Sequence, residues 1–461
     1  MHDLKYFSRK QNRDTSLHKN KKKPRNTFRI AEISRPKRKR LRLLLPALAI
    51  LLALYPLIFG IKSFLPFVSN LLRHNSVNAK MSSSASDTKQ PFSEASQLLN
   101  SARVQDDKLV APFPGGGSIL FTIDPELQAR VQEVMRSKDV PYGVFVAIEP
   151  KSGRILALTG YSSIDPSWGN NPYFNLYPMA SLFKIITTAA ALELKKVGPE
   201  TPFAYRGSSY SENPKYWGVT PGQSTQTMPL SLALGRSINP VFGRLASDYV
   251  GVDSIMKYAR RFGFNQTLFP GTPITPSKAA EPLDERQLRL MGAGLGREVK
   301  ISPLHAAVII AAIANQGRMM TPLLAQEIRD KSGALQYINQ SKSIRTLVAK
   351  ETADQLSSML LTTVTKGTSR KAFHDRRGRP LLASINIAAK TGSINGTDPS
   401  GHYSWFAAFA PVEDPQIAVV ALIINQDKWK IKATYLGEQA LEKFFDEKSS
   451  AGHSTPGTSF Q

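Results

Sequence analysis

The chain has 461 residues, of which 41% are hydrophobic, so it is long enough and apolar enough to bury one large core or two or three ordinary ones. It contains no cysteine, which excludes disulfides, thiolate catalysis and every metal centre that needs cysteine ligands. Its 60 Lys and Arg against 35 Asp and Glu give a net charge of +25, which raises the question of a nucleic-acid partner.

The excess positive charge is concentrated at the N-terminus. Residues 1–42 hold 16 Lys or Arg and 3 acidic residues, whereas the rest of the chain holds 44 and 32 and is only mildly basic. The uncharged, mostly apolar run LLLPALAILLALYPLIFGI (43–61) follows directly. At about 1.5 Å rise per residue this run approaches the ~30 Å hydrocarbon thickness of a bilayer. A single transmembrane helix is therefore expected within an anchor segment, 43–72.

A buried core helix and a cleavable signal peptide are the alternatives for this run. A signal peptide has an apolar region of roughly 7–15 residues after a short basic segment, and both segments are longer here, which favours an uncleaved anchor. The positive-inside rule then places residues 1–42 in the cytoplasm and the rest of the chain outside it, on the periplasmic side of the inner (cytoplasmic) membrane. Basic residues beside a membrane span are expected to contact lipid headgroups, so no nucleic-acid partner is predicted.

Composition divides the remainder into three parts. Residues 73–117 are polar, rich in serine and closed by PFPGGGS, which predicts a flexible linker. A folded domain is expected over residues 118–445. The polar residues 446–461 are expected to form a disordered tail.

Within the folded domain the pattern predicts strands at both ends and helices in the middle. A strand at ILFTID precedes a helix that has Asp124 as N-cap and Pro125 at its first position. GVFVAIEP and ILALTG form a hairpin, because turn residues separate two apolar runs. The middle, roughly 181–320, is mainly helical and includes a helix capped at Ser302. A helix is expected next, at 351–367. Three strands follow at 385–391, 403–411 and 416–425, and the last helix is expected at 434–447.

This order predicts an α+β fold, in which an antiparallel sheet is flanked by helices and joined to an all-helical lobe. The candidate nucleophile is Ser181, at the start of an apolar helix with Lys184 three residues on. Residues at this spacing share a helix face, and the helix N-terminus favours an oxyanion formed nearby. A partly buried lysine can lose its proton and act as a base. The alternative is that Ser181 is an ordinary N-cap.

Two further motifs distinguish Ser181 from the other serines with a lysine three residues on, which are Ser16, Ser34, Ser86 and Ser254. Ser237-Ile238-Asn239 falls between two apolar, helix-like segments. Lys390-Thr391-Gly392-Ser393 contains the only Lys-Thr-Gly of the sequence and follows a strand-like run. The three motifs in this order are typical of serine acyl-transferases that use a Ser–Lys pair.

The region 119–445 resembles the transpeptidase domain of penicillin-binding proteins, in the superfamily that they share with β-lactamases. The resemblance rests on segments that come in the order of the family, which are TIDPELQ, VAIEPKSGRILAL, MASLFKI, SINPVFGRLA, AAKTGS and WFAAFAP. It implies the fold described above. It also implies a membrane-anchored peptidoglycan D,D-transpeptidase that crosslinks the cell wall and is acylated by β-lactams.

The resemblance implies a role for each motif residue. Ser181 would attack a D-Ala–D-Ala stem peptide and form an acyl-enzyme, with Lys184 taking its proton. Ser237 would relay a proton to the departing nitrogen, and Asn239 would bind the amide of the acyl donor and position Lys184. Lys390 would bind the terminal carboxylate and support the relay.

The remaining motif residues would bind substrate. Thr391 would share the carboxylate with Lys390, and Gly392 would leave room for substrate beside its strand. The backbone N–H groups of Ser181 and Ser393 would form the oxyanion hole. The implied partners are peptidoglycan stem peptides, β-lactam antibiotics, membrane lipid and cell-wall synthesis proteins.

No cofactor or metal is expected. The histidines of the folded region, His305, His374 and His402, lack ligand-like spacing. GAGLGREVK (292–300) has glycines spaced as in a phosphate loop but no following Lys-Ser or Lys-Thr, so no nucleotide site is predicted. A D,D-carboxypeptidase, a β-lactamase and a non-catalytic β-lactam sensor remain as alternative functions.

Overall fold

The computed structural model describes residues 91–452. The predicted basic segment 1–42, the predicted anchor 43–72 and the end of the predicted tail lie outside the described residues. Within 91–452, no helix combines the length and the apolar character needed to cross a bilayer.

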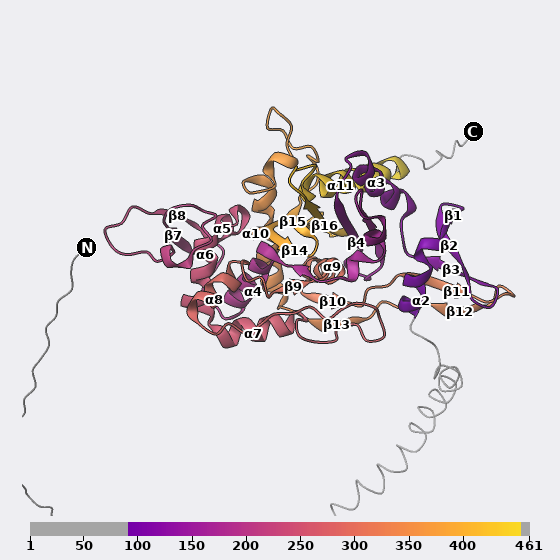
Figure 1. Ribbon diagram of the computed structural model, residues 1–461, viewed down its shortest axis with the longest axis horizontal. Helices are drawn as coiled ribbons and strands as arrows, with labels where there is room; N and C mark the ends of the chain where they lie inside the picture. The colour runs from indigo at the N-terminus through magenta and orange to yellow at the C-terminus, as the bar shows by residue number, and fades with distance from the viewer. Residues whose placement is uncertain (1–90, 453–461) are drawn as a thin grey trace, which may run out of the picture. The chain divides into compact units, whose positions relative to one another are not determined.

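A five-stranded antiparallel sheet is the centre of the domain (Figure 1). Its strands lie in the order β14 (Ala388–Thr397), β15 (Ser400–Ala410), β16 (Ile417–Asn425), β4 (Tyr142–Ile148) and β5 (Ile155–Tyr161). The predicted hairpin is β4–β5, and the three predicted C-terminal strands are β14, β15 and β16, so these predictions are confirmed. The chain thus closes its central sheet with strands from both ends of the domain.

Both faces of this sheet are buried, which explains why β16 is an unbroken run of apolar residues. Successive side chains of a strand point to opposite faces. Val420 and Leu422 accordingly belong to the core under the helical lobe, whereas Val419 and Ala421 belong to the core on the other side. The first core contains α9 (Pro303–Ala314), and the second contains α3 (Pro125–Ser137) and α11 (Ala433–Gly452) (Figure 1).

Helix caps lie where the sequence predicted them. The Asp124 carboxylate accepts hydrogen bonds from the backbone N–H groups of Glu126 and Leu127, and Pro125 opens α3. The Ser302 hydroxyl oxygen accepts from the N–H of His305 at 3.2 Å and caps α9. α11 runs to Gly452 and therefore continues past residue 446, where the tail was expected to begin, and an ion pair one turn apart, Lys443–Glu447, lies within it.

The middle of the chain makes a mainly helical lobe, as predicted, but the prediction of an all-helical lobe is wrong, because short antiparallel strand pairs lie within it. Its helical elements are η4 (Ala180–Phe183), α4 (Lys184–Glu193), η5 (Pro214–Tyr216), α5 (Leu230–Arg236), α6 (Asn239–Arg244), the π-helix η6 (Leu245–Val250), α7 (Val252–Arg261), α8 (Glu285–Gly292) and α10 (Lys350–Thr365). Short antiparallel pairs interrupt it, namely β6 (Tyr177–Pro178) with β9 (Lys300–Ile301), β7 (Pro202–Tyr205) with β8 (Gln226–Pro229), and β10 (Arg318–Met320) with β13 (Ser343–Thr346). Four further short 3-10 helices lie in the described part of the chain, which are η1 (Leu99–Ser101), η2 (Pro166–Gly169), η3 (Pro172–Phe174) and η7 (Arg370–Ala372).

The prediction of a flexible linker up to residue 117 is wrong for its second half. Residues from 91 onward form α2 (Pro91–Leu98) and then join a second antiparallel sheet, whose strands lie in the order β1 (Arg103–Gln105), β2 (Lys108–Phe113), β3 (Gly117–Phe121), β11 (Ala325–Arg329) and β12 (Leu335–Ile338). Phe92, Leu99 and Leu109 are buried in the main core. PFPGGGS therefore spans the end of β2, the hairpin turn and the start of β3, and β3 pairs in turn with β11, which is remote in sequence.

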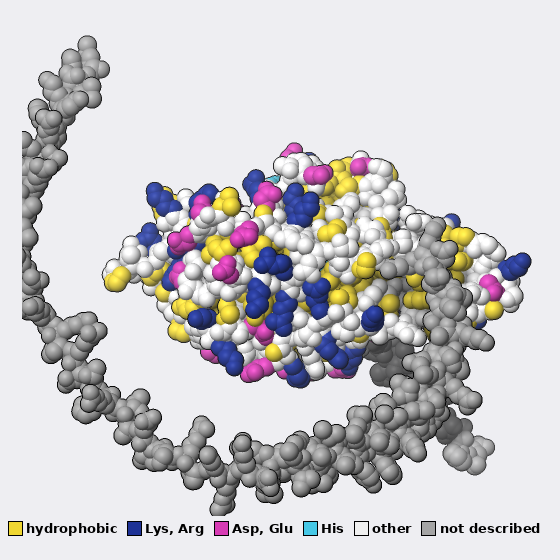
Figure 2. Space-filling view, turned by 90° about the horizontal axis from the view of Figure 1, so that it is seen from below, with side chains coloured by type: hydrophobic (Ala, Val, Ile, Leu, Met, Phe, Trp, Pro, Cys, Tyr) yellow, Lys and Arg dark blue, Asp and Glu magenta, His cyan; other side chains and the backbone are white. Residues whose placement is uncertain are grey.

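Charges on the domain are mixed in sign. Figure 2 shows Lys and Arg side chains spread over one face, with acidic and apolar side chains between them. Several described ion pairs are exposed on both sides, for example Lys151–Asp414 and Lys350–Asp354, and exposed pairs contribute little to stability. The fold therefore depends on its two cores.

One polar side chain in the helical lobe couples stability to pH. His305 is buried, with Nδ1 2.7 Å from the Ser277 hydroxyl and Nε2 2.9 Å from the Phe262 carbonyl oxygen. A carbonyl oxygen only accepts, so Nε2 carries the proton and Nδ1 accepts from Ser277. Burial lowers the pKa of His305 from 6.5 to about 4.

We expect the folded domain to lose stability as the pH falls from 6.5 towards 4. The unfolded chain binds a proton at His305 in this range and the folded chain does not, at a cost of up to about 3 kcal/mol. Thermal unfolding between pH 7.5 and 5 should show a steeper loss in the wild type and in a His374→Gln control than in His305→Gln. Equal pH dependence in all three proteins would contradict this assignment.

Candidate active site

Ser181 and Lys184 lie next to each other because the chain tightens into a 3-10 turn just before α4. Ser181 is in η4, and α4 begins at Lys184. Side chains three residues apart eclipse each other in a 3-10 helix. Lys184 Nζ accordingly lies 2.7 Å from Ser181 Oγ. The sequence placed both on one helix face, and the structure brings them into hydrogen-bond contact.

Lys184 is completely buried. Its Nζ also lies 2.7 Å from Asn239 Oδ1, and it faces the ring of Phe242 at 5.8 Å from the centroid. Burial in the core, and secondarily the positive charge of Lys390, hold the pKa of Lys184 well below its usual value of 10.5. This environment favours the neutral amine, which can accept a proton.

Ser237 and Asn239 reach the site from the connection between two short helices. Ser237 ends α5 in a left-handed conformation with φ of +58°, and Asn239 is the first residue of α6. The Asn239 backbone N–H donates to the Ser209 carbonyl at 2.8 Å, and its Nδ2 donates to the Ser211 carbonyl at 3.3 Å. These bonds fix the orientation of the amide, so that Oδ1 faces Lys184.

Lys390 is the second buried lysine of the site and comes from β14. Its Nζ donates to Ser237 Oγ at 2.8 Å and to the Thr391 carbonyl at 2.7 Å. Burial lowers its pKa from 10.5 to about 7. Lys390 therefore links the strand to Ser237 and changes charge near neutral pH.

β14 has only β15 as a neighbour in its sheet, so among the described strands it is an edge strand. Its free edge faces Ser181. A Cβ placed on Gly392 would lie 3.1 Å from Ala180 Cβ and 3.4 Å from the Ser181 nitrogen, so any side chain here would crowd the serine. An edge strand can add an extended peptide through its unpaired backbone groups. The Thr391 hydroxyl lies 2.6 Å from that of Thr368.

These residues surround one cleft of about 410 Å³ between the helical lobe and β14. Figure 1 shows α5 and α6 in the lobe beside this strand. The cleft is lined by Ser181, Tyr210, Glu212, Ser237, Asn239, Leu295, Thr368, Thr391, Gly392, Ser393, Ser404, Trp405, Lys432 and Thr434. Among the described residues, no group of three or more His, Asp or Glu side chains lies close enough to hold a metal ion. The structure thus brings the three sequence motifs together, with Lys184 and Lys390 beneath the exposed groups.

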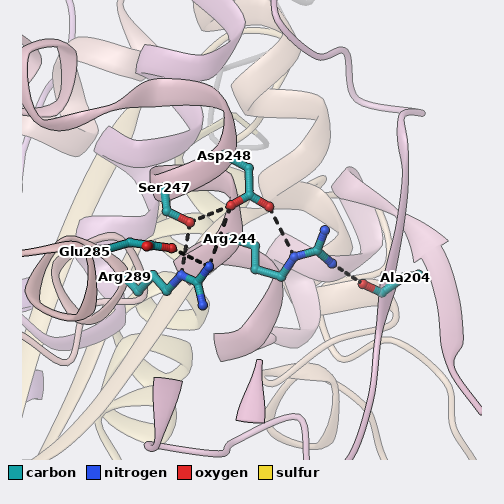
Figure 3. Close-up of polar contacts among 6 residues, drawn as sticks. All are labelled: Ala204, Arg244, Ser247, Asp248, Glu285 and Arg289. Carbon is teal, nitrogen blue, oxygen red and sulfur yellow. Dashed lines mark hydrogen bonds and ion pairs between the residues drawn. The ribbon is translucent and has the colours of Figure 1, made fainter. Parts of the chain in front are cut away.

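A polar network supports the helix that carries Asn239. Asp248, in the π-helix that continues α6, accepts from Arg244 Nε at 3.2 Å and lies 3.9 Å from Arg289 Nη2. Arg244 donates to the Ala204 carbonyl at 3.0 Å, which ties α6 to β7. Figure 3 shows that this network joins α6, η6, α8 and β7 through six residues, which are Ala204, Arg244, Ser247, Asp248, Glu285 and Arg289.

A family model described as the penicillin-binding protein transpeptidase domain matches residues 143–446. The chain belongs to this family. It is 30% identical over 348 residues to the peptidoglycan D,D-transpeptidase PbpA of Mycolicibacterium smegmatis, an alignment that covers 67% of this chain and 68% of that protein.

Solved structures of penicillin-binding proteins have the same fold. The crystal structure of PBPA from Mycobacterium tuberculosis matches with a TM-score of 0.59 at 26% identity, over 71% of this chain and 82% of that one. The penicillin G acyl-enzyme complex of penicillin-binding protein A from the same organism matches with a TM-score of 0.58 at 26% identity, over 72% and 81%. The α+β architecture and the family predicted from sequence are therefore confirmed.

Sequence reasoning missed several residues of this penicillin-binding protein cleft. Thr368, Tyr210, Glu212 and Lys432 lie in segments without a recognisable motif. Gly294 belongs to GAGLGREVK (292–300), a segment for which the sequence predicts no ligand site. Its φ is +71°, and a Cβ here would lie 2.8 Å from Ser181 Cα and collide with the Ala180 carbonyl oxygen. The three glycines close together in this segment are the sequence feature that could have predicted a close backbone contact with the serine turn.

We expect Gly294→Ala to destabilise the domain by at least about 2 kcal/mol, because both the left-handed backbone and the contact with Ala180 reject a side chain. Gly296→Ala is the matched control, since the nearest atom to its added Cβ would be 3.4 Å away. Thermal unfolding of both variants and the wild type measures the difference. Equal stability of the two variants would show that this packing does not constrain the serine turn.

Proposed function

We propose that this chain is a membrane-anchored peptidoglycan D,D-transpeptidase that forms a serine acyl-enzyme with D-Ala–D-Ala stem peptides and is acylated by β-lactams. The observation that carries the proposal is the buried amine of Lys184, 2.7 Å from both Ser181 Oγ and Asn239 Oδ1. The relative named peptidoglycan D,D-transpeptidase PbpA and the solved penicillin G acyl-enzyme complex support it.

Acylation begins at Ser181. A neutral Lys184 donates a hydrogen bond to Asn239 Oδ1 and accepts the proton of the Ser181 hydroxyl. Oγ then forms a bond to the carbonyl carbon of the penultimate D-Ala, and the electron pair moves to the carbonyl oxygen. Backbone N–H groups of Ser181 and Ser393 bind this oxyanion, at the start of a helix and beside an edge strand.

Collapse of the oxyanion breaks the amide bond, and the departing nitrogen takes the proton from Lys184 through the hydroxyl of Ser237. Lys390 donates to Ser237 Oγ at 2.8 Å, so it aligns this relay. Together with Thr391, it binds the terminal carboxylate of the leaving D-Ala. An acceptor amine from a second stem peptide then attacks the ester and releases Ser181, which conserves the acyl bond without a nucleotide.

The predicted anchor belongs to the same proposal. A helix within residues 43–72 would hold the enzyme in the cytoplasmic membrane, with residues 1–42 in the cytoplasm and the transpeptidase domain on the periplasmic side. The crosslinking substrate lies on that side. Membrane lipid and other cell-wall synthesis proteins are the proposed partners there.

A fluorescent penicillin should label the full-length membrane protein and leave Ser181→Ala unlabelled, because only Ser181 can form the stable ester. Gel fluorescence of wild type, Ser181→Ala and the control Ser254→Ala tests this, since Ser254 has the same spacing to a lysine outside the cleft. Undiminished labelling of Ser181→Ala would overturn the nucleophile assignment. Rapid hydrolysis of a chromogenic cephalosporin would instead favour a β-lactamase, and release of D-Ala without crosslinks would favour a carboxypeptidase.

The second-order rate constant of acylation by benzylpenicillin should be bell-shaped against pH. Protonation of Lys184 removes the base at low pH. Deprotonation of Lys390, with a pKa of about 7, removes the charge that binds the carboxylate, so the rate should fall up to tenfold per unit above that pH. Lys390→Arg should keep the charge and move the alkaline limb upward. A wild-type rate that stays constant from pH 6 to 9 would contradict this role.

A further inference from the structure

Two exposed side chains of opposite charge line the cleft. Of the described residues that line it, only Glu212 and Lys432 carry a formal charge. Both side chains are exposed, and neither makes an ion pair or a side-chain hydrogen bond with another described residue. Charges that border a binding cleft without a protein partner are available to a ligand.

Glu212 lies on the wall formed by the helical lobe. The preceding residue, Ser211, is held in place from two directions. Its carbonyl accepts from Asn239 Nδ2 at 3.3 Å, and its hydroxyl oxygen accepts from Trp217 Nε1 at 3.1 Å. Trp217 is fully buried, so the backbone beside Glu212 has a rigid support. The backbone that carries Glu212 is therefore held close to Asn239.

Lys432 lies on the opposite wall. The N–H of the next residue, Ala433, donates to Ser404 Oγ at 3.1 Å, and Ser404 pairs with Ser393 across β14 and β15. The Lys432 ammonium is 5.6 Å from the centroid of the Trp429 ring, which stacks on His402 at 5.7 Å and an interplanar angle of 16°. A cation over an indole face has a preferred position, so this ammonium is held beside Trp429, while the backbone of the next residue is tied to β15.

The two charges flank one half of the cleft. In the proposed function, Lys390 and Thr391 bind the departing D-Ala, so the half of the cleft that contains them and Thr368 holds this leaving group. Asn239 and Ser393, which border Glu212 and Lys432, are the groups assigned to the amide and carbonyl of the acyl donor. A side chain of the donor that projects from this half would come within reach of the two walls that carry Glu212 and Lys432.

We propose that Glu212 and Lys432 are specificity-determining residues for an acyl donor whose side chain carries both an ammonium and a carboxylate. The ammonium would pair with Glu212 and the carboxylate with Lys432. A neutral side chain would leave both protein charges without a partner, and a side chain of single charge would satisfy one of them. This inference rests on the proposed function, because it assigns the acyl half of the same cleft.

Three penicillins test the inference one charge at a time. Benzylpenicillin, ampicillin and carbenicillin differ only at the α-carbon of the acyl side chain, which carries hydrogen, an ammonium or a carboxylate. The measurement is the second-order acylation rate constant of the full-length protein in low salt, expressed as a ratio to benzylpenicillin. Variants are Glu212→Gln and Lys432→Gln. Lys428→Gln and Glu281→Gln are matched controls, because both residues are exposed and neither lines the cleft.

Glu212→Gln should lower the ampicillin ratio roughly two- to fivefold, and Lys432→Gln should lower the carbenicillin ratio by a similar factor, as expected for partly exposed charge pairs. Both effects should shrink in high salt, and the controls should retain the wild-type ratios. Ratios that do not change in either variant, or that change for only one of the charged penicillins, would overturn the inference. Absence of any Ser181-dependent acylation would instead reject the proposed function.

Discussion

The chemistry of the cleft depends on keeping water away from two lysine amines. Lys184 and Lys390 are both fully buried, and burial is the largest cause of the lowered pKa of each. A lysine in water is protonated at neutral pH and cannot act as a base. Here the core replaces water by a small set of oxygen partners, which are Ser181, Asn239, Ser237 and the Thr391 carbonyl. The same desolvation that would destabilise an ordinary protein core prepares this one for proton transfer.

That constraint accounts for much of the surrounding architecture. Each lysine comes from a different element, α4 or β14, and two of their partners, Ser237 and Asn239, come from the connection between α5 and α6. These elements must be held rigidly, because a shift of about 1 Å would break hydrogen bonds of 2.7 to 2.8 Å. The network around Asp248 fixes α6, and the sheet, buried on both faces, fixes β14. Gly294 and Gly392 then let the backbone of the serine turn lie directly against its neighbours.

The distribution of charge in the cleft follows from the same separation. Two lysine amines, Lys184 and Lys390, are buried beneath it, whereas the charged residues that line it, Glu212 and Lys432, are exposed. Buried groups can control protonation because they are desolvated. Exposed groups are screened by solvent and salt, so they are suited to choosing among substrates by modest factors. In the proposed function, the buried lysines therefore serve the reaction, and the exposed Glu212 and Lys432 serve the choice of substrate.

The sequence by itself determined the local elements and the family. Apolar runs separated by turn residues predicted β4, β5 and β14 to β16, caps such as Asp124 and Ser302 marked helix starts, and three short motifs in order predicted the candidate site. Apolar runs, helix caps and short motifs each lie within one short segment, so each can be recognised without knowing how the chain folds. The expected linker failed because β1 and β2 pair in turn with β3, and β3 pairs with β11, some 200 residues later in the chain. Only the tertiary structure decided the burial of both lysines, the approach of Gly294 to Ser181, and the place of Glu212 and Lys432 in one cleft, because desolvation and proximity arise when distant segments pack together.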